Sequence, residues 1–399
     1  MSAHSITNPT RRNKIALCLE YPIDLQGGVS VLCAVLARHF SSRYEITLVS
    51  PDTEETLDRS PHRDSFTSLI RWDPQRASIA TARELGVALA QHGVELAHFH
   101  YGGPFGFGNR LLGHSPIPCA VRRGVATCST VHLVIGPLEG YCGPEKPWWF
   151  KVATWPVAWA GKMNTLRHLR REVTVSRWGE ARLRNRYFPL RNRFQTIYHS
   201  RLAVSEMSAS ESTKERVVLS VGHVAPRKGQ LILAQAFAKI ASRHPDWNLL
   251  ILGGINAPEC EHQIRDIIAR QRLQGRIEML GSRPDALDFM RRAAVFVQPS
   301  FFEGLPLALQ EAMLMRCACI GTNIPGNTEI VTDGVNGLLV PCGDVSSMAD
   351  AIDRLLANDR LRGEFQGVAR NSVLDKGMSV EHMVDEHARL YEQMLAEDC

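Results

Sequence analysis

The apolar residues of this 399-residue chain fall into short runs separated by amphipathic stretches. In the first half, the pattern predicts strands over 14–20, 45–49, 94–99, 126–131, 173–176 and 194–198, with helices over 29–40 and 76–92. Regular alternation of strand and helix is typical of a doubly wound parallel sheet.

A second series of the same kind follows a polar segment, 206–216, which is interpreted as a linker. Strands are predicted over 217–222, 248–253, 277–280, 295–298 and 317–321, with helices over 230–242, 259–272, 284–292, 306–315 and from 346 onward. We therefore expect an α/β protein of two Rossmann-like domains, 1–204 and 205–375, facing a central cleft. A C-terminal helix, 376–399, could cross back to the N-terminal domain.

Composition narrows the protein class. Apolar residues make up 44% and charged residues 22%, which excludes wholesale disorder, collagen-like repeats and coiled-coil rods. No uninterrupted apolar run reaches about 18 residues, and the polar start lacks a signal-peptide pattern, so neither a membrane span nor secretion is expected. Ten singly scattered cysteines favour reduced, buried thiols in a cytoplasmic protein over disulfides or a zinc site.

Charge is concentrated in one segment. Residues 162–193 carry ten Lys/Arg and two Glu, a local excess of +8 in a chain whose net charge is +5. Four tryptophans, Trp148, Trp149, Trp155 and Trp159, come just before it. Tryptophan with Lys/Arg is typical of an interfacial membrane element, so 148–193 is a candidate for contact with an anionic membrane surface. A core-packed helix with a solvated face is the alternative, and Pro156 should interrupt any helix there.

The most informative motif is PSFFEGLPLALQEAM, residues 299–313. A strand ends at its start, Glu303 lies in the following loop, and a helix is predicted to begin with Pro306 at its first position. Glu311 then lies about 7–8 Å further along the helix axis. Carboxylates accept hydrogen bonds from the paired hydroxyls of ribose or hexose, so the spacing suits an elongated nucleotide-sugar.

Backbone donors of the same motif complement the two carboxylates. The N–H groups of Gly304 and Leu305 precede the predicted helix, and a helix N-terminus favours anions. The motif therefore offers acceptors for sugar hydroxyls beside donors for phosphate.

A second motif, GHVAPRKG at 222–229, follows a strand directly. Arg227 and Lys228 are placed to offset the negative charge of a departing diphosphate. The chain has no Asp-x-Asp pair, so these cations are the natural substitute for a metal ion. Neither a Walker loop nor GxGxxG is present. We expect no metal and no cofactor.

These motifs resemble the C-terminal domain of retaining family-four glycosyltransferases, which have the GT-B fold. The resemblance covers 217–357 through VGHVAPRKG, FVQPSFFEGLPLALQEAM and GTNIPGNTEIVTDGVNGLLVPCGD. The first half is similar more weakly, through the loop after the first strand, HFHYG at 98–102 and VTVSRW at 173–178.

The resemblance implies roles for individual residues. The acidic pair of the family holds the donor sugar and ribose, the lysine contacts the diphosphate, the glycine loop approaches donor or acceptor, and a histidine after an N-domain strand contacts the sugar or acceptor. On this basis the candidate catalytic residues are Lys228, Arg227, Glu303 and His132, and the candidate donor-binding residues are Gly27, Gly28, His223, Gly304, Leu305 and Glu311.

The chain departs from the family pattern at three places. His223 stands where members have arginine, and Arg227 is the nearby residue that could compensate. The crossover between the domains reads IYHSRL (197–202) where IPNGVD is usual. After the helix that carries Glu311, Arg316 replaces a glycine and Ala318 a proline.

The implied function is metal-independent transfer of a sugar from a nucleotide-diphosphate sugar, with retained configuration, to a glycan or lipid-linked acceptor. Cell-surface polysaccharide or glycolipid synthesis, in the cytoplasm or at the inner face of the membrane, would suit such an enzyme. A nucleic-acid partner is not expected. Two alternatives stay open: a phosphorylase or epimerase of the same fold, and a catalytically silent scaffold that binds a glycan, anionic lipid or RNA.

Overall fold

The computed structural model describes residues 12–25, 27–103, 106–107, 115–134, 147–207 and 213–396. Residues 1–11, for which no signal peptide is expected, lie outside the described residues. The centre of the predicted linker, 208–212, also lies outside them. The chain forms two compact units. One unit runs to Ile197 and takes the chain again from Val384, and the other is Tyr198–Met383. The cleft expected between the two domains stays a prediction.

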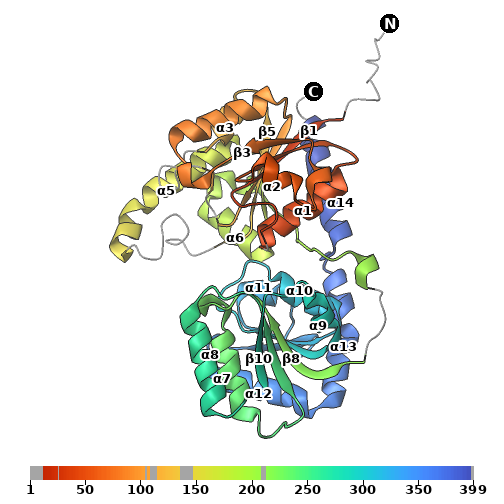
Figure 1. Ribbon diagram of the computed structural model, residues 1–399. Helices are drawn as coiled ribbons and strands as arrows, with labels where there is room; N and C mark the ends of the chain where they lie inside the picture. Colours follow the sequence, from red (N-terminus) through yellow and green to blue (C-terminus); the bar gives the residue numbers. More distant parts are fainter. Residues whose placement is uncertain are drawn as a thin grey trace. The chain divides into compact units, whose positions relative to one another are not determined.

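The N-terminal domain is built on a seven-stranded, fully parallel sheet with strand order β3-β2-β1-β4-β5-β6-β7. Its strands are β1 Lys14–Leu19, β2 Glu45–Ser50, β3 Ser68–Arg71, β4 Leu96–Tyr101, β5 Ala126–Val131, β6 Arg171–Thr174 and β7 Phe194–Thr196. Its helices are α1 Gly28–Phe40, α2 Glu54–Asp58, α3 Ile79–Gln91, α4 Ile117–Val121, α5 Trp148–His168, α6 Arg177–Arg186 and, from Val384 onward, α14 Val380–Ala396. In Figure 1, α3 and α5 lie on one side of this sheet, and α1 and α14 on the other.

The second domain holds a six-stranded parallel sheet with strand order β10-β9-β8-β11-β12-β13. Its strands are β8 Glu215–Val221, β9 Asn248–Leu252, β10 Ile277–Gly281, β11 Ala293–Gln298, β12 Ala318–Thr322 and β13 Gly337–Val340. Its helices are α7 Gln230–Ile240, α8 Pro258–Arg270, α9 Ala286–Arg292, α10 Leu307–Leu314, α11 Pro325–Thr328, α12 Val345–Ala357 and α13 Asp359–Leu374. Helices α7, α8 and α12 pack together on one face, and α9, α10 and α13 on the other.

The predicted class, two doubly wound α/β domains, is confirmed. Continuous apolar strands such as β1 and β11 are buried along nearly their whole length, as expected for a parallel sheet covered on both faces. In both sheets the strand order reverses next to the first strand of its domain, between β1 and β4 and between β8 and β11. Loops that follow these strands on the carboxyl edge therefore diverge and leave room for a ligand.

Helix α5 corrects one expectation. It is continuous over 21 residues although Pro156 lies inside it. Proline removes one N–H bond to the carbonyl four residues earlier, that of Val152. Because Val152 is exposed on this helix, water can satisfy that carbonyl and the helix continues.

The described cysteines fit the expectation of reduced thiols. Eight are free; seven of these are buried and Cys342 is exposed. In the described part of the chain, no helix has the length and apolar character needed to cross a membrane.

Candidate functional site

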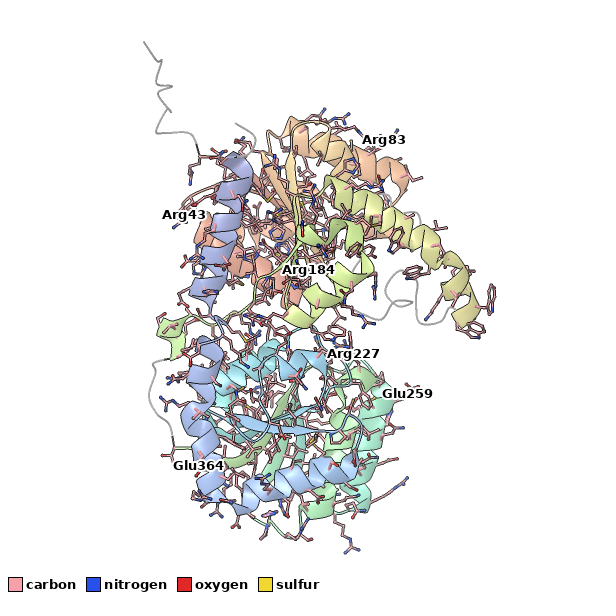
Figure 2. The ribbon with its side chains drawn as sticks, turned by 180° about the vertical axis from the view of Figure 1, so that it is seen from behind. Arg43, Arg83, Arg184, Arg227, Glu259 and Glu364 are labelled. Carbon is pink, nitrogen blue, oxygen red and sulfur yellow. The ribbon has the colours of Figure 1, made fainter. Side chains whose placement is uncertain are left out.

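Two loops that are far apart in sequence meet at the carboxyl edge of the second sheet. One follows β8 and carries Arg227 and Lys228; the other follows β11 and carries Glu303. They meet because β8 and β11 are neighbours in the sheet. The backbone joins them as well, since the Phe301 N–H donates to the Arg227 carbonyl over 2.8 Å. Arg227 is labelled in this loop in Figure 2.

Glycine is required where these loops cross. Gly229 has a φ of +71°, and a Cβ there would stand 2.0 Å from the Pro299 carbonyl oxygen. Any other residue would push the two loops apart. The glycine of the GHVAPRKG motif is thus explained by close backbone approach.

Glu303 is the centre of the cluster. Lys228 Nζ lies 2.7 Å from its Oε1, and Arg227 donates to its Oε2 over 3.2 Å. The Ser300 hydroxyl and the Gln298 amide also donate to Oε1, over 2.7 and 3.1 Å. Burial of this carboxylate, which is 7% exposed, raises its pKa, but the two cations outweigh burial, so the pKa lies below its ordinary value. Glu303 is therefore ionised at neutral pH.

The predicted backbone donors lie beside this cluster. The prediction that Pro306 is the first residue of α10 is wrong. Pro306 is the N-cap, because its ψ of 104° is extended, and the helix begins at Leu307. Within the described residues, the N–H groups of Gly304 and Leu305 donate to no acceptor. Two unsatisfied donors before a helix N-terminus can receive an anion.

Glu311 is buried on α10 and is 2% exposed. Arg201 binds it in bidentate fashion, through Nε to Oε1 and through NH2 to Oε2 over 2.6 Å. Burial raises the pKa of Glu311 above its ordinary value, and Arg201 opposes that shift. Sequence analysis missed Arg201, although it lies in IYHSRL, where the chain departs from the family.

His223 takes no part in these ion pairs. Its side chain is exposed in the loop after β8, and its ring lies over Gly254, where a Cβ would come within 3.4 Å of Nδ1. Its carbonyl accepts from the Gln230 amide over 2.9 Å. Arg227, the residue expected to compensate, lies on the Glu303 cluster instead.

The N-terminal domain places its candidates at the carboxyl edge of its own sheet. His132 follows β5, and its Nε2 lies 3.3 Å from Nδ1 of the buried His100 on β4. Burial lowers the pKa of His132 well below its ordinary value, and the neighbouring His100 and His387 add to the shift. His132 is therefore neutral at pH 7.

The glycine pair lies at the start of α1, after β1. Gly27 is the N-cap, with an extended φ of −131°, and a Cβ there would make only ordinary contacts with Leu25. The turn is held by Asp52, which accepts from the Ile23 N–H over 2.9 Å. Neither strain nor local crowding requires glycine at position 27, and glycine is one of the residues preferred at an N-cap. Approach of donor or acceptor to this loop stays a prediction.

In the candidate membrane segment 148–193, some tryptophans are exposed and others pack against the domain. Trp148 and Trp149 are 74% and 59% exposed, whereas Trp159 donates to the Arg186 carbonyl over 3.0 Å and stacks on Tyr187. Lys162, counted in the basic segment, is buried in an ion pair with Glu172. Because this pair removes one charge of each sign, the local excess of +8 is unchanged.

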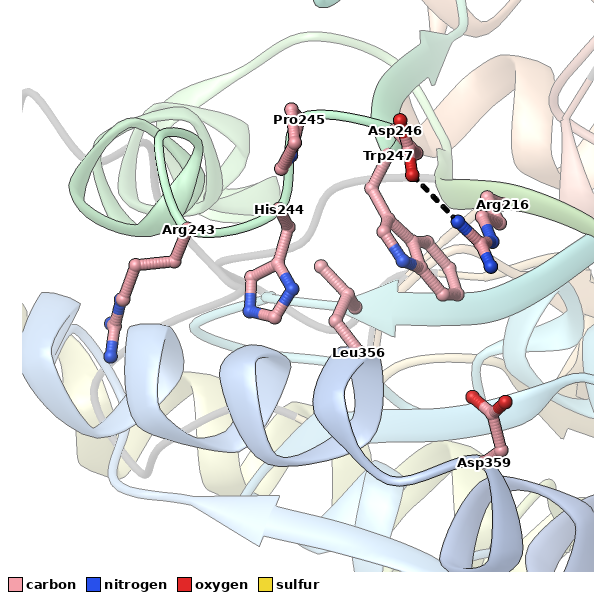
Figure 3. Close-up of a pocket in the computed structure, with 8 residues that line it drawn as sticks. All are labelled: Arg216, Arg243, His244, Pro245, Asp246, Trp247, Leu356 and Asp359. Carbon is pink, nitrogen blue, oxygen red and sulfur yellow. Dashed lines mark hydrogen bonds and ion pairs between the residues drawn. The ribbon is translucent and has the colours of Figure 1, made fainter.

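A separate hollow of about 180 Å³ lies in the second domain, before the amino ends of β8 and β9 (Figure 3). Its lining is Arg216, Arg243, His244, Pro245, Asp246, Trp247, Leu356 and Asp359. Arg216 pairs with Asp246, and Arg243 and His244 pair with Asp353. It lies at the opposite edge of the sheet from Glu303, so it belongs to a different part of the domain.

No group of three or more His, Cys, Asp or Glu side chains is placed to hold a metal ion, as far as the structure describes the chain.

Comparison with known proteins agrees with this geometry. The profile described as Glycosyltransferase Family 4 matches residues 26–200, and that of Glycosyl transferases group 1 matches residues 205–372. The chain belongs to the family 4, group 1 glycosyltransferases.

Relatives of this glycosyltransferase include a phosphatidyl-myo-inositol mannosyltransferase of Mycolicibacterium smegmatis, 34% identical over 161 residues, which are 39% of this chain and 40% of the relative. An Escherichia coli UDP-Gal:alpha-D-GlcNAc-diphosphoundecaprenol alpha-1,3-galactosyltransferase is 30% identical over 184 residues, 45% of this chain and 46% of the relative. This chain spans about half the length of the curated relatives that it matches.

Solved structures confirm the fold class. Anabaena HepE in complex with UDP superposes with a TM-score of 0.73 at 16% identity, covering 96% of this chain and all of HepE. WaaG, a glycosyltransferase involved in lipopolysaccharide biosynthesis, gives a TM-score of 0.71 at 14% identity over 94% of this chain and 99% of WaaG. This glycosyltransferase has the predicted GT-B fold.

Proposed function

We propose that this protein transfers a sugar from a nucleotide-diphosphate sugar to a glycan or lipid-linked acceptor, with retained configuration and without a metal ion. The observation that supports the proposal best is the cluster of Glu303, Lys228 and Arg227 beside the unsatisfied N–H groups of Gly304 and Leu305. It combines cations and amide donors for a diphosphate with an ionised carboxylate for sugar hydroxyls.

The chemistry follows from these charges. As the bond between the anomeric carbon and the phosphate oxygen breaks, negative charge builds on the nucleoside diphosphate. Lys228 and Arg227 lie close enough to Glu303 to face both the sugar and the departing phosphate, and they stabilise that charge. The acceptor oxygen attacks the same face of the sugar, and its proton passes to the departing phosphate oxygen. Glu303 orients the sugar hydroxyls through this step.

Donor binding tests the proposal directly. We expect one of UDP, GDP or ADP to raise the melting temperature in the presence of EDTA, and the matching nucleotide-sugar to be hydrolysed or transferred. Lys228→Met should lower turnover by roughly 10²-fold, because it removes charge stabilisation of the leaving group. Lys239→Met is the matched control, since Lys239 is an exposed lysine that contacts Ser346 in the same domain.

Each opposite outcome is informative. Stabilisation by a nucleotide without any turnover would favour the silent scaffold, and loss of turnover with EDTA would refute metal independence. If no nucleotide binds the wild-type protein, the proposed function is wrong.

Features of the N-terminal domain, where the acceptor is expected to bind, favour an acceptor held in a membrane. The N-terminal end of α5 projects from the rest of its domain in Figure 1 and exposes Trp148, Trp149 and Val152. The basic residues from Arg167 onward begin about 28 Å further along the helix, at 1.5 Å per residue. With α5 flat on an anionic surface, the exposed tryptophans at its start would insert. Arg167 near its end, and the arginines that follow the helix, would neutralise headgroups. We propose peripheral contact with the inner face of the membrane on this basis.

Vesicle flotation separates this contact from nonspecific adhesion. Wild-type protein should float with vesicles that contain anionic lipid at low salt, and Trp148→Ala with Trp149→Ala should abolish flotation. Arg167→Glu with Arg177→Glu should weaken it in a salt-dependent way. Val335→Ala, at an exposed apolar residue of the second domain, should have no effect. Equal flotation of all variants would count against the proposal.

A further inference from the structure

Arg201 holds a carboxylate that the proposed function needs for the donor. It comes from the segment that enters the second domain, 110 residues before Glu311. Its side chain is 33% exposed, whereas that of Glu311 is 2% exposed. One end of the guanidinium therefore faces a buried carboxylate while the rest of the side chain reaches the surface.

Arg201 does not use all the hydrogen-bonding capacity of the Glu311 carboxylate. Each carboxylate oxygen can accept two hydrogen bonds, and Arg201 uses one on each oxygen of Glu311. One acceptor position on each oxygen remains, which matches the two neighbouring hydroxyls of a ribose. A protonated carboxyl group could not serve both hydroxyls in this way.

Burial of Glu311 disfavours the ionised carboxylate that would accept both ribose hydroxyls. Removal from water favours the uncharged form and raises the pKa of Glu311, and Arg201 supplies the opposing charge and hydrogen bonds. The bidentate pairing also fixes the direction of the carboxylate plane. Without Arg201, a buried carboxyl group on α10 would be protonated over a wider pH range and free to rotate.

The backbone around Arg201 is fixed. The Tyr198 hydroxyl donates to Glu329 over 2.7 Å, and the Val380 N–H donates to the Leu202 carbonyl over 3.4 Å. Both contacts lie within the second domain. The guanidinium is therefore presented from an anchored segment, which reduces the entropy that ligand binding must overcome.

We propose that Arg201 is a positioning residue of the donor site, which holds the Glu311 carboxylate by a bidentate pair and aims it at the two ribose hydroxyls of the nucleotide. The inference rests on the proposed function and adds to it the residue on which ribose recognition depends. It makes IYHSRL a functional replacement of the usual crossover sequence.

Binding measured against pH tests this role. UDP, GDP and ADP are titrated by calorimetry into wild-type protein and into Arg201→Met, Arg201→Lys and Glu311→Gln between pH 6.5 and 9. At pH 7 we expect Arg201→Met to weaken binding of the preferred nucleotide at least tenfold. Binding should recover toward wild-type at pH 9, because Glu311 then ionises without help. Glu311→Gln should bind the nucleotide weakly at every pH. The affinity of Arg201→Lys should lie between those of wild-type protein and Arg201→Met.

Two controls make the result specific. Arg216→Met removes an arginine that pairs with an exposed aspartate of the same domain, and should leave binding unchanged. The 2′-deoxy and 3′-deoxy forms of the preferred nucleotide should bind wild-type protein more weakly than the parent nucleotide does. In Arg201→Met, the deoxy forms and the parent nucleotide should bind with almost equal affinity. Arg201→Lys keeps the test available if Arg201→Met does not fold.

The outcomes separate the two proposals. If wild-type protein binds no nucleotide, the proposed function fails. If wild-type binds but Arg201→Met binds equally well or more tightly, Arg201 is not a positioning residue and instead competes with the nucleotide. A loss in Arg201→Met that does not change with pH shows a merely structural role and also overturns the inference.

Discussion

Single residues explain the geometry of the motifs and show where the chain departs from its family. Gly229 lets two loops cross, and Arg201 occupies both oxygens of Glu311. The sequence located Glu303, Lys228 and Arg227 correctly near one another in the chain's second half, because strand ends and motif spacing can be inferred locally. It could not pair Arg201 with Glu311, because that contact joins segments 110 residues apart.

Arg316 provides a prediction at this scale. It follows α10 with a φ of +59°, in the left-handed region that favours the glycine usual in the family. Arg316→Gly should therefore stabilise the protein by about 0.5–1 kcal/mol, measured by urea unfolding. Arg272→Gly is the matched control, since Arg272 has a φ of +54° and an exposed side chain. A loss of stability in Arg316→Gly alone would show that its side-chain contacts outweigh the strain.

The elements show which patterns can be interpreted from sequence. Buried strands such as β11 are apolar throughout and were predicted, whereas β3 was missed. It is an edge strand with only Ile70 buried, so it lacks a continuous apolar run. Helix α5 was not predicted as one helix, because Pro156 disfavours a helix locally while packing of its C-terminal half decides the outcome. Tertiary contacts override propensity at such places.

The ion pair that fastens α5 to its sheet gives the second prediction. Lys162 donates to Glu172 on β6 over 2.6 Å, and Ser129 donates to the same oxygen over 3.0 Å. Lys162→Met should destabilise the protein by about 3–5 kcal/mol, because it leaves a buried carboxylate without its cation. Combining it with Glu172→Met should restore most of that stability. Urea unfolding of the single and double variants measures the difference.

The exposed pair Arg59 and Glu55 of the same domain is the control for that cycle. Arg59→Ala should change stability by no more than about 1 kcal/mol, as surface ion pairs usually do. If the double variant of the buried pair were no more stable than Lys162→Met, packing and not charge would hold α5 in place.

At the scale of the whole molecule, each domain has its own core and its own carboxyl edge. Sequence analysis could assign both domains because each repeats the strand–helix alternation that builds a parallel sheet. It allowed for a C-terminal helix, 376–399, that crosses back to the N-terminal domain, and from Val384 onward α14 belongs to that domain. It could not name the contacts of this helix, in which Tyr391 packs against Phe40 and His98. Such long-range packing depends on shape complementarity that no local pattern records.

The two domains should respond differently to mild acid. His132 in the first domain has a pKa well below 6.5, so below pH 6.5 the unfolded chain binds a proton that the folded domain does not. Stability therefore falls as pH falls through 6.5. In the second domain, the lowered pKa of Glu303 stabilises the fold, and this stabilisation is lost only as the pH falls below about 4.5. The raised pKa of Glu311 has the opposite effect, because it makes the fold more stable as the pH falls.

Between pH 7 and 5.5 we expect the first domain to lose about 1 kcal/mol from His132, a fall in melting temperature of roughly 2–4 °C. Tryptophan fluorescence follows this domain, because six of the seven tryptophans precede residue 198 and Trp247 alone lies in the second. His132→Gln should flatten the pH dependence, because it removes the group that titrates only in the unfolded chain. An unchanged slope in that variant would assign the acid sensitivity to other groups of the domain.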